Sequence, residues 1–257
     1  MLSIIIPTMQ KDLEVLNKLL YELQESEHVG QIIVIDNSCK GLKTDFSKVE
    51  VYVQKENLFV NPAWNLGIEL MSDKYPIFGI LNDDIILPKN LFKAVDEFFK
   101  NSDENVGLAG IDCAKNTPKE LFDTYPKDSE VKFEKTNKLY GFWGAAFFGR
   151  KEHYYTIPNE MKIFYGDHFV FTRNLQNHRQ NYKITNIEVK HLESLTSHCS
   201  KIARNYFAKD RKACIKHDGV EHQKLSILHR ICSITYYHEH YVFCLLGIKV
   251  KFKCKKA

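Results

Sequence analysis

Two adjacent carboxylates stand between apolar residues in the sequence ILNDDII at residues 80–86. Residues 75–81 predict a buried strand, and residues 88–100 predict the helix that follows it. The acids therefore lie at the carboxyl end of a strand, where open α/β sheets bind ligands. Such close carboxylates repel each other unless a cation, a hydroxyl group or a proton lies between them. The stretch indicates a cation site, with a polar turn whose side chains bond to the backbone as the alternative.

Apolar periodicity along the chain predicts the elements that position these acids. The predicted strands are residues 2–6, 31–35, 49–54, 75–81, 106–113 and 182–190, and the predicted helices are residues 12–23, 61–71, 88–100, 168–176 and 201–217. Strands that alternate with helices predict βαβ units and a mainly parallel sheet. The strand ends at Thr8, Asp36 and Asp83 would then meet at one edge.

Two segments between these elements allow more than one interpretation. Residues 115–138 are polar and contain two prolines, which favours an excursion or a hairpin. Residues 141–150 combine three glycines with large aromatic rings. They suit a close-packed turn beside a ligand and equally a glycine-kinked core strand.

Composition limits the class of protein. With 257 residues and 44% hydrophobic content, the chain can bury one large core, and we expect one main domain. The 36 basic residues face 32 acidic ones, so the charge pattern does not indicate a nucleic-acid partner. Seven scattered cysteines without zinc-ligand spacing favour reduced thiols in a cytosol. We expect no signal peptide and no membrane span.

The last forty residues differ in character from the rest. Residues 225–246 are rich in apolar residues but are interrupted by charges, and apolar residues then alternate with lysines from Ile248 to Lys253. An apolar face backed by lysines predicts peripheral binding to an anionic inner membrane, where lipid-linked acceptors are found. The alternative is an added strand or a homodimer contact.

The order of short motifs resembles the inverting GT-A glycosyltransferases of family 2 over residues 1–217. The motifs are IIIPT at 4–8, IVIDNS at 33–38, Asn57, NPAWNLGI at 61–68, NDD at 82–84, GFWG at 141–144, YGD at 165–167, and His191 followed by Ser194 and Ser197. The resemblance implies a Rossmann-like α/β fold with a mainly parallel sheet flanked by helices. It implies a nucleotide-binding half of about residues 1–114, an acceptor and catalytic half at 115–217, and a helical and basic C-terminal extension at 218–257.

The resemblance also implies where the donor nucleotide binds. Pro7, Thr8 and Asp36 would line the base, with the Asp36 carboxylate accepting from the ring N–H of uracil or thymine. Asn57 and Asn65 would lie near the base and the ribose. The alternative for Asp36 is a turn residue that bonds to its own backbone.

By the same resemblance, Asp84 would bind Mn²⁺ or Mg²⁺, while Asp83 holds the ribose or supports the metal ligands. His191 would be a further metal ligand, with an ordinary hydrogen-bonded histidine as the alternative. Asn82 stands where the family usually has its first acid, as in rhamnosyltransferase-like members. This departure leaves fewer charges around the cation.

Asp167 is the implied general base, which takes the proton from the acceptor hydroxyl group in a single displacement. The alternative is a helix N-cap, and the neighbouring Gly166 replaces an acid that the family usually has. Trp143, with Phe142, would pack on the sugars, or else fill the core.

Two further side chains on predicted helices complete the assignments. Arg204 would reach the diphosphate, or else belong to a solvated face together with Lys201 and Lys209. For Trp64 the core interpretation is preferred.

The resemblance therefore implies a metal-dependent inverting glycosyltransferase of the hexosyltransferase type. It would move a sugar from a UDP or dTDP donor to a glycan or lipid-linked acceptor, in the cytoplasm or on the inner membrane, during bacterial capsule, surface-polysaccharide or lipooligosaccharide assembly. One alternative is a sugar nucleotidylyltransferase, but that class needs a glycine-rich loop after its first strand and residues 7–12 contain no glycine. Another is a non-catalytic scaffold with a transferase-like fold, which Asn82 and Gly166 favour.

Overall fold

The computed structural model describes residues 1–113, 117–139, 143–192, 201–218, 232–237, 240–245 and 248–253. Side chains are described for these residues up to 192 and for 205–218. The chain divides into two compact units, Met1–Gly219 and Val220–Ala257. We describe each unit by itself.

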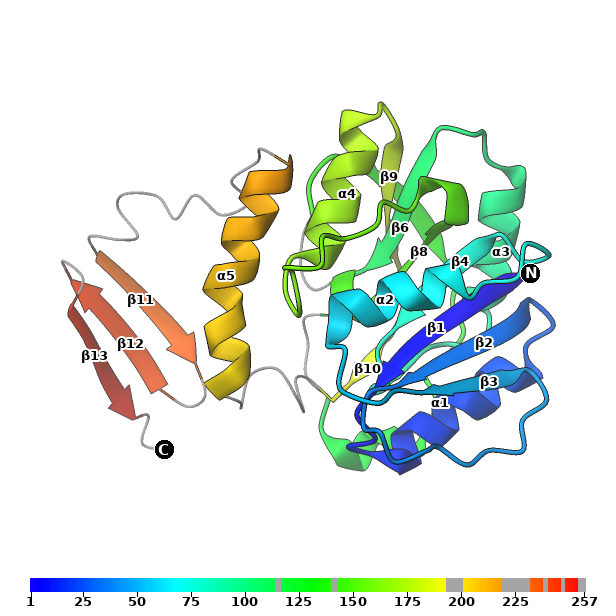
Figure 1. Cartoon of the computed structure of the whole chain (residues 1–257), viewed down its shortest axis with the longest axis horizontal. Coiled ribbons are helices and arrows are strands. Elements are labelled where there is room, and N and C mark those ends of the chain that lie inside the picture. The colour runs from blue at the N-terminus through cyan, green and yellow to red at the C-terminus, as the bar shows by residue number, and fades with distance from the viewer. Residues whose placement is uncertain are drawn as a thin grey trace. The chain divides into compact units, whose positions relative to one another are not determined.

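The first unit is built on an eight-stranded sheet with the order β3-β2-β1-β4-β8-β6-β9-β7 (Figure 1). Its strands are β1 (Leu2–Thr8), β2 (Val29–Asp36), β3 (Val49–Val53), β4 (Ile77–Leu81), β6 (Val106–Ile111), β7 (Lys132–Thr136), β8 (Ala146–Arg150) and β9 (Gln180–Thr185). The first four strands pair in parallel, as do β6 and β9. Strand β8 runs antiparallel between β4 and β6, and β7 runs antiparallel to β9. The sheet is therefore mixed, and its longest parallel part is formed by β1 to β4.

Helices cover both faces of this sheet (Figure 1). They are α1 (Leu13–Glu25), α2 (Val60–Glu69), α3 (Leu91–Asn101), α4 (Gly166–Gln176) and α5 (Lys201–Asp218). Side chains of α1 and α3 belong to one buried cluster. Those of α2, α4 and α5 belong to a second buried cluster. This is the three-layer α/β arrangement that the alternation of predicted strands and helices indicated.

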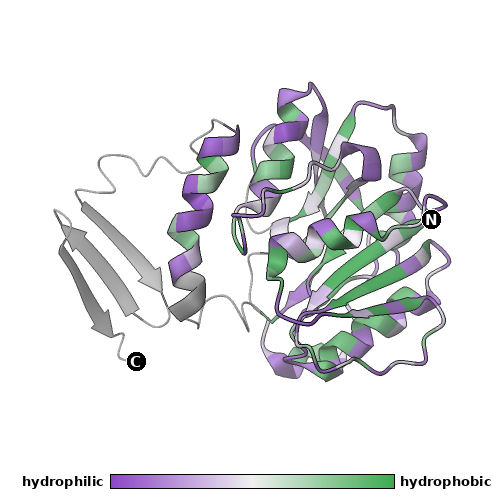
Figure 2. Ribbon diagram, viewed as in Figure 1, coloured by the Kyte–Doolittle hydropathy of each residue, from purple (hydrophilic) through white to green (hydrophobic). Residues whose placement is uncertain are grey.

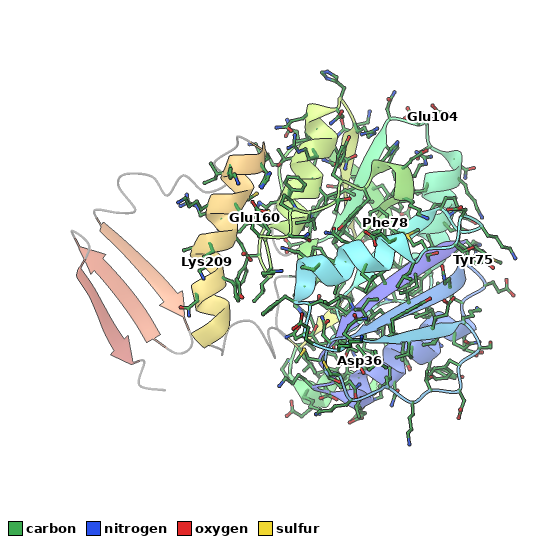
Figure 3. All side chains as sticks on the ribbon, viewed as in Figure 1. Asp36, Tyr75, Phe78, Glu104, Glu160 and Lys209 are labelled. Atoms are coloured by element: carbon green, nitrogen blue, oxygen red, sulfur yellow. The ribbon has the colours of Figure 1, made fainter. Side chains whose placement is uncertain are left out.

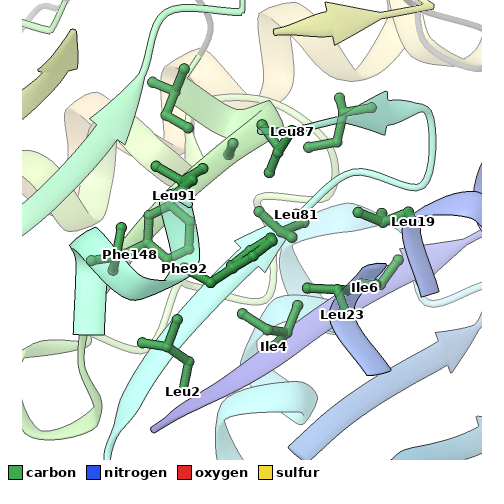
Figure 4. Packing of buried hydrophobic residues seen from close by; sticks show 14 of the residues in the cluster. Leu2, Ile4, Ile6, Leu19, Leu23, Leu81, Leu87, Leu91, Phe92 and Phe148 are labelled. Carbon is green, nitrogen blue, oxygen red and sulfur yellow. The ribbon is translucent and has the colours of Figure 1, made fainter. Parts of the chain in front are cut away.

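The side chains of strand β1 are divided between the two buried clusters. Because successive side chains of a strand point to opposite faces, Leu2, Ile4 and Ile6 lie in the cluster with α1 and α3. Ile5 lies in the other cluster. Figure 4 shows the first cluster, and Figure 2 shows hydrophobic central strands beneath helices with hydrophilic outer faces. Burial on both faces explains the continuous apolar run at the start of the chain.

The expected elements are present, with differences in three places. The prediction of a single strand over residues 182–190 is wrong, because β9 ends at Thr185 and a separate strand β10 (Lys190–His191) follows. Strand β10 pairs with another two-residue strand, β5 (Ile85–Ile86). The polar excursion holds a short 3₁₀ helix, η1 (Lys119–Asp123), and β7. Of the two interpretations of residues 141–150, β8 supports the core strand.

In the second unit, the described residues form a three-stranded antiparallel sheet of β11 (Cys232–Tyr237), β12 (His240–Leu245) and β13 (Ile248–Lys253). Helix α5 ends at Asp218, where the expected extension begins, and the described residues of that extension are strands and not helices. The alternation of apolar residues and lysines at 248–253 therefore belongs to a strand, which was the alternative interpretation. No helix among the described residues is long and apolar enough to cross a membrane.

Asp96 is a buried acid that ties α3 to the amino end of the sheet. Its carboxylate accepts hydrogen bonds from the Met1 ammonium group (2.7 Å), His28 Nδ1 (2.9 Å) and Lys100 Nζ (2.8 Å). Burial alone would raise the pKa of Asp96. The three hydrogen-bond donors together outweigh burial and lower this pKa to about 2.

We predict that Asp96→Asn lowers the free energy of unfolding at pH 7 by about 2 kcal/mol, because a carboxylate with a lowered pKa stabilises the folded state. This stabilisation is present above the ordinary carboxyl pKa of 3.8 and is lost as the pH falls toward about 2. Urea unfolding between pH 7 and pH 2 should show a smaller loss of stability in the variant. Glu97→Gln, an exposed neighbour on α3, is the control, and equal acid sensitivity of Asp96→Asn and the native chain would contradict the prediction.

Candidate functional site

The carboxyl ends of β1, β2 and β4 meet at one edge of the sheet. In the parallel register, Thr8 lies beside Asp36, and β1 also pairs in parallel with β4. The Thr8 hydroxyl group donates a hydrogen bond to Asp83 Oδ2 over 2.5 Å. Figure 3 labels Asp36 at this edge and Tyr75 at the opposite end of the sheet. The structure thus brings together the three strand ends that the sequence predicted to meet.

Asp36 is fully buried at this edge and is held by hydrogen bonds to both of its carboxylate oxygens. Oδ1 accepts from the backbone N–H (2.9 Å) and the hydroxyl group (2.6 Å) of Ser38. Oδ2 accepts from the Gly41 backbone N–H (2.8 Å) and from Gln10 Nε2 (2.9 Å). The turn role considered for Asp36 is therefore present in the structure, and base recognition stays a prediction.

Asp83 and Asp84 are adjacent acids, of which Asp83 is half-buried and Asp84 is buried. Burial raises the pKa of Asp83 to about 6, and the charge of Asp84 adds to this effect. Hydrogen bonds from the Thr8 hydroxyl group and the Met9 backbone lower this pKa in part. Ionising both acids is electrostatically costly, and a bound cation would offset this cost.

The two-residue strands β5 and β10 place His191 beside Asp84. His191 pairs with Ile85, and the Leu192 N–H donates to the Asp84 carbonyl oxygen over 3.0 Å. The His191 backbone also exchanges hydrogen bonds with Thr117. As a result, the His191 Nε2 atom lies 3.5 Å from Asp84 Oδ1.

The second ring nitrogen of His191 fixes its tautomer. Nδ1 lies 2.8 Å from the Cys113 carbonyl oxygen, which can only accept, so Nδ1 carries a proton. In the neutral ring, Nε2 then presents its lone pair toward Asp84 Oδ1. That carboxylate oxygen is buried, and none of the described residues donates a hydrogen bond to it.

This donor pair fits a divalent cation. Two atoms 3.5 Å apart can both lie within ~2.1 Å of one ion, and a carbonyl group on the far nitrogen is the usual support of a metal-binding histidine. Within the described part of the chain, no three or more His, Cys, Asp or Glu side chains are grouped for a metal. Among the described residues, Asp84 and His191 are therefore the facing donor pair, and further ligands would come from outside this pair.

Lys190 anchors the strand that carries His191. Its ammonium group is buried and donates to the carbonyl oxygens of Leu121 (2.5 Å) and Thr124 (2.5 Å) and to the Thr124 hydroxyl group (2.6 Å). These bonds tie β10 to the end of η1. The buried position and the absence of a carboxylate partner among the described residues indicate a structural role.

Asp167 lies in the first turn of α4, near the amino end of that helix. The residue before the helix is Tyr165, in a left-handed conformation, and the helix has no side-chain cap. The N-cap alternative for Asp167 is therefore wrong. Instead, its Oδ2 atom accepts a hydrogen bond from the Gly144 backbone N–H over 3.0 Å, which orients the carboxylate.

Two predicted nucleotide-binding asparagines have local roles in the structure. The Asn65 side chain is buried and bonds to the Ile157 backbone (2.8 and 3.0 Å) and to the Tyr154 hydroxyl group (2.8 Å). Exposed Asn57 accepts from the Phe59 backbone N–H over 2.8 Å. Nucleotide contacts by Asn57 and Asn65 stay predictions.

Trp143 is 1% exposed and lies in the core. Its ring packs edge-on against Phe171 and covers Gly110, where an added Cβ atom would lie 2.2 Å from the indole. Buried Trp64 packs against Phe147, which confirms its core interpretation. A sugar contact by Trp143 stays a prediction.

The remaining predicted residues are placed only in part. Pro7 is half-buried near the end of β1. Arg204 lies on α5, but its side chain is outside the described residues, as is that of Lys201. Lys209 is exposed, as expected for a solvated face (Figure 3). Gly141, Phe142, Ser194 and Ser197 also lie outside the described residues.

The sequence analysis missed two polar residues at this edge. Gln10 bonds to Asp36, and Asn37 bonds through its side chain to the Leu58 N–H (3.2 Å) and the Phe59 carbonyl group (3.1 Å). Both follow a strand end by one or two residues, which is the only signal that the sequence carried.

Fold and site define an α/β protein with an acidic, histidine-containing site at the carboxyl ends of its parallel strands. The sequence model named Glycosyl transferase family 2 matches residues 3–157, more than half of the chain. The chain belongs to glycosyl transferase family 2 and has the GT-A fold. A comparison with curated proteins finds no match.

Solved structures with the same fold include S. aureus TarS 1–349, with a TM-score of 0.55 and 13% identity over 86% of this chain and 67% of that one. The same protein in complex with UDP-GlcNAc gives a TM-score of 0.52 and 14% identity, over 86% and 68% of the two chains. GalNAc-T7 with UDP, GalNAc and Mn²⁺ gives a TM-score of 0.52 and 12% identity, over 80% and 47%. At these identities the likeness is one of fold.

We predict that Trp143→Ala lowers the free energy of unfolding by about 3–5 kcal/mol, because it leaves a large cavity beside Gly110 and Phe171. Chemical denaturation measures this cost. Tyr21→Ala, which removes a half-exposed ring on α1, is the control and should cost much less. Native stability in Trp143→Ala, together with weakened binding of a UDP-sugar, would instead support the sugar contact.

Proposed function

We propose that the chain is a metal-dependent inverting glycosyltransferase that moves a sugar from a UDP or dTDP donor to a hydroxyl group of a glycan or lipid-linked acceptor. The observation that carries the proposal is the Asp84–His191 pair at the sheet edge that also holds Asp36 and Asp83. Residues 1–114 would contribute most of the donor site and residues 115–217 the acceptor side. Membership of the family and the UDP-sugar complex of TarS support this assignment.

Asp84 and His191 would hold Mn²⁺ or Mg²⁺, since their facing donor atoms are separated by a distance that suits one ion. A bound divalent cation offsets the negative charge that develops on the diphosphate leaving group. Asp83 is held by Thr8 and lies next to these ligands, so it would contact the ribose or orient the metal ligands. The GalNAc-T7 complex with UDP and Mn²⁺ supports a metal in this fold.

Asp36 would recognise the base at the other end of the donor site. Its ionised carboxylate is an acceptor only, which matches the ring N–H of uracil and thymine. Pro7 and Thr8 at the end of β1 lie beside it in the register. Thr8 links Asp36 to Asp83, so the ribose and diphosphate would lie between the Asp36 turn and the Asp84–His191 pair.

Asp167 would act as the general base. Inverting transfer requires a carboxylate that takes the proton of the acceptor hydroxyl group as its oxygen attacks the anomeric carbon. The Gly144 N–H holds Oδ2 and so orients the carboxylate, which leaves Oδ1 to receive that proton. The reaction needs no protein nucleophile, because a single displacement forms one glycosidic bond as the other breaks.

The setting that we propose is bacterial surface-polysaccharide or lipooligosaccharide assembly in the cytoplasm, where a lipid-linked acceptor would bring the chain to the inner membrane. The support is the basic strand β13, which has three lysines in six residues. Liposome flotation of the full chain and of a chain ending at His217 tests this part. Equal recovery of both in the soluble fraction would exclude binding through residues 218–257.

Asp84→Asn should abolish the extra stabilisation that Mn²⁺ gives to the UDP complex, because the neutral amide removes the anionic metal ligand. We expect Mn²⁺-dependent UDP binding to weaken at least about tenfold. A thermal-shift panel of UDP, dTDP, GDP and CMP, each with and without Mn²⁺, measures this effect. Stabilisation of the native chain by none of these nucleotides would contradict the proposed function and favour the scaffold alternative.

Asp167→Asn should lower turnover about 10²- to 10⁴-fold while UDP binding is kept. The measurement is release of the nucleoside diphosphate from a panel of UDP- and dTDP-sugars, with water as the acceptor. Glu104→Gln, an exposed acid remote from the site, is the control (Figure 3). Undiminished release by a folded Asp167→Asn variant would overturn the general-base assignment.

A further inference from the structure

Gln10 lies between the two ends of the proposed donor site and belongs to none of the motifs. Its backbone N–H donates to Thr8 Oγ1 over 2.8 Å, and its Nε2 atom donates to Asp36 Oδ2 over 2.9 Å. Thr8 Oγ1 itself donates to Asp83 Oδ2. A continuous chain of hydrogen bonds therefore runs from Asp83 through Thr8 and Gln10 to Asp36.

The hydrogen bonds to Asp36 use its accepting capacity in full. An ionised carboxylate has about four lone-pair positions. Four described donors fill them, from Ser38, Gly41 and Gln10, and the Asp36 side chain has no exposed surface. A base that donates its ring N–H to Asp36 must therefore take the place of one of these donors.

Among these donors, Gln10 is the one that can leave without loss of the turn. Ser38 and Gly41 belong to the turn that follows β2, and Gly41 has a left-handed φ of 83° that few other residues adopt. The Gln10 amide comes from a different loop, is half-buried and needs only a side-chain rotation to move away. The Gln10 backbone stays fixed meanwhile, because its N–H is bonded to Thr8.

We propose that the Gln10 amide occupies the base-recognition position of Asp36 in the free protein, and that uracil or thymine displaces it on binding. This inference rests on the proposed function, in which Asp36 recognises the base. The exchange replaces one N–H donor on a carboxylate by another, so Asp36 stays fully bonded in both states. Cytosine has an acceptor nitrogen at the corresponding ring position, so this ring atom cannot replace the amide. A base that brings its own N–H group is therefore the kind of base that can take the place of the Gln10 amide on Asp36.

The consequence for affinity follows from competition. When the free protein is held in a state that excludes the ligand, the apparent affinity falls by the fraction of molecules that remain competent. Removing the competing amide should therefore strengthen binding of a uracil nucleotide. We expect the dissociation constant of UDP to fall about three- to tenfold.

Gln10→Asn is the most informative variant. Asn tolerates the left-handed conformation of this position, where φ is 52°, and its amide is one carbon too short to make the same bond to Asp36. The matched control is Gln24→Asn, at a half-buried glutamine on α1 that bonds to Ser47 and Lys48 away from this edge. Isothermal titration of the full chain with UDP and with CDP, each with Mn²⁺, measures the effect.

Tighter UDP binding by Gln10→Asn, with CDP unchanged and with Gln24→Asn equal to the native chain, supports the proposal. Unchanged or weaker UDP binding by Gln10→Asn overturns it, and so does an equal gain for CDP. Both of these outcomes leave the proposed function intact. If the native chain and both variants bind neither UDP nor dTDP, the proposed function fails and this inference fails with it.

Discussion

The parallel pairing of β1 with β2 on one side and β4 on the other is the constraint on which the candidate site depends. It aligns the carboxyl ends of three strands, so that Thr8 pairs with Asp36 of β2 and donates a hydrogen bond to Asp83, which follows β4. Close packing holds the strands in this register. Gly67 of α2 lies where an added Cβ atom would be 2.3 Å from Ile5, and Gly79 of β4 is similarly covered by Ile4. A larger residue at either glycine would force the helix or strand away and separate the acids.

The buried carboxylates at the two ends of this edge, Asp36 at one and Asp84 at the other, differ in how they are hydrogen-bonded. The carboxylate of Asp36 is fully bonded within the chain, so the base end is satisfied before any ligand arrives. At the other end, burial raises the pKa of Asp83, and Asp84 faces a histidine nitrogen across 3.5 Å. In the proposed donor site, Asp36 would therefore be fully bonded before the nucleotide binds, whereas Asp84 and His191 would need a cation between them.

The sequence predicted most of the fold because its strands are short, continuous apolar runs and its helices have clear apolar faces. It also predicted that Asp36 and Asp83 would approach, since parallel strands end at the same edge. The residue pattern alone could not predict that His191 contacts Asp84, because the pairing of β5 with β10 covers only two residues and leaves no periodic signal. Only the resemblance to the family placed the two side chains at one site. Nor could the residue pattern decide between core and surface for Trp143, because an aromatic residue beside glycines suits both environments.

The difference between Asp167 and its predicted alternative has a similar cause. An aspartate at the start of a helix is a common N-cap. Here the N-cap position is held by the left-handed Tyr165, so that Asp167 lies inside the first turn of the helix. Only the tertiary contact with Gly144 shows which way the carboxylate faces. The hydrogen bond between Gln10 and Asp36 could not be predicted for the same reason, because the two residues are remote in sequence.

The buried Lys190 affects the energetics of cation binding at the proposed Asp84–His191 site. Three hydrogen bonds on Lys190 and the pairing with β5 hold His191 from two sides, so the imidazole has little freedom to relax toward or away from Asp84. If the proposed ion binds here, the two donor atoms are preorganised for it, and the reorganisation energy that binding must overcome is small. Such a rigid pair would compensate in part for the acid that the resemblance leads one to expect at Asn82.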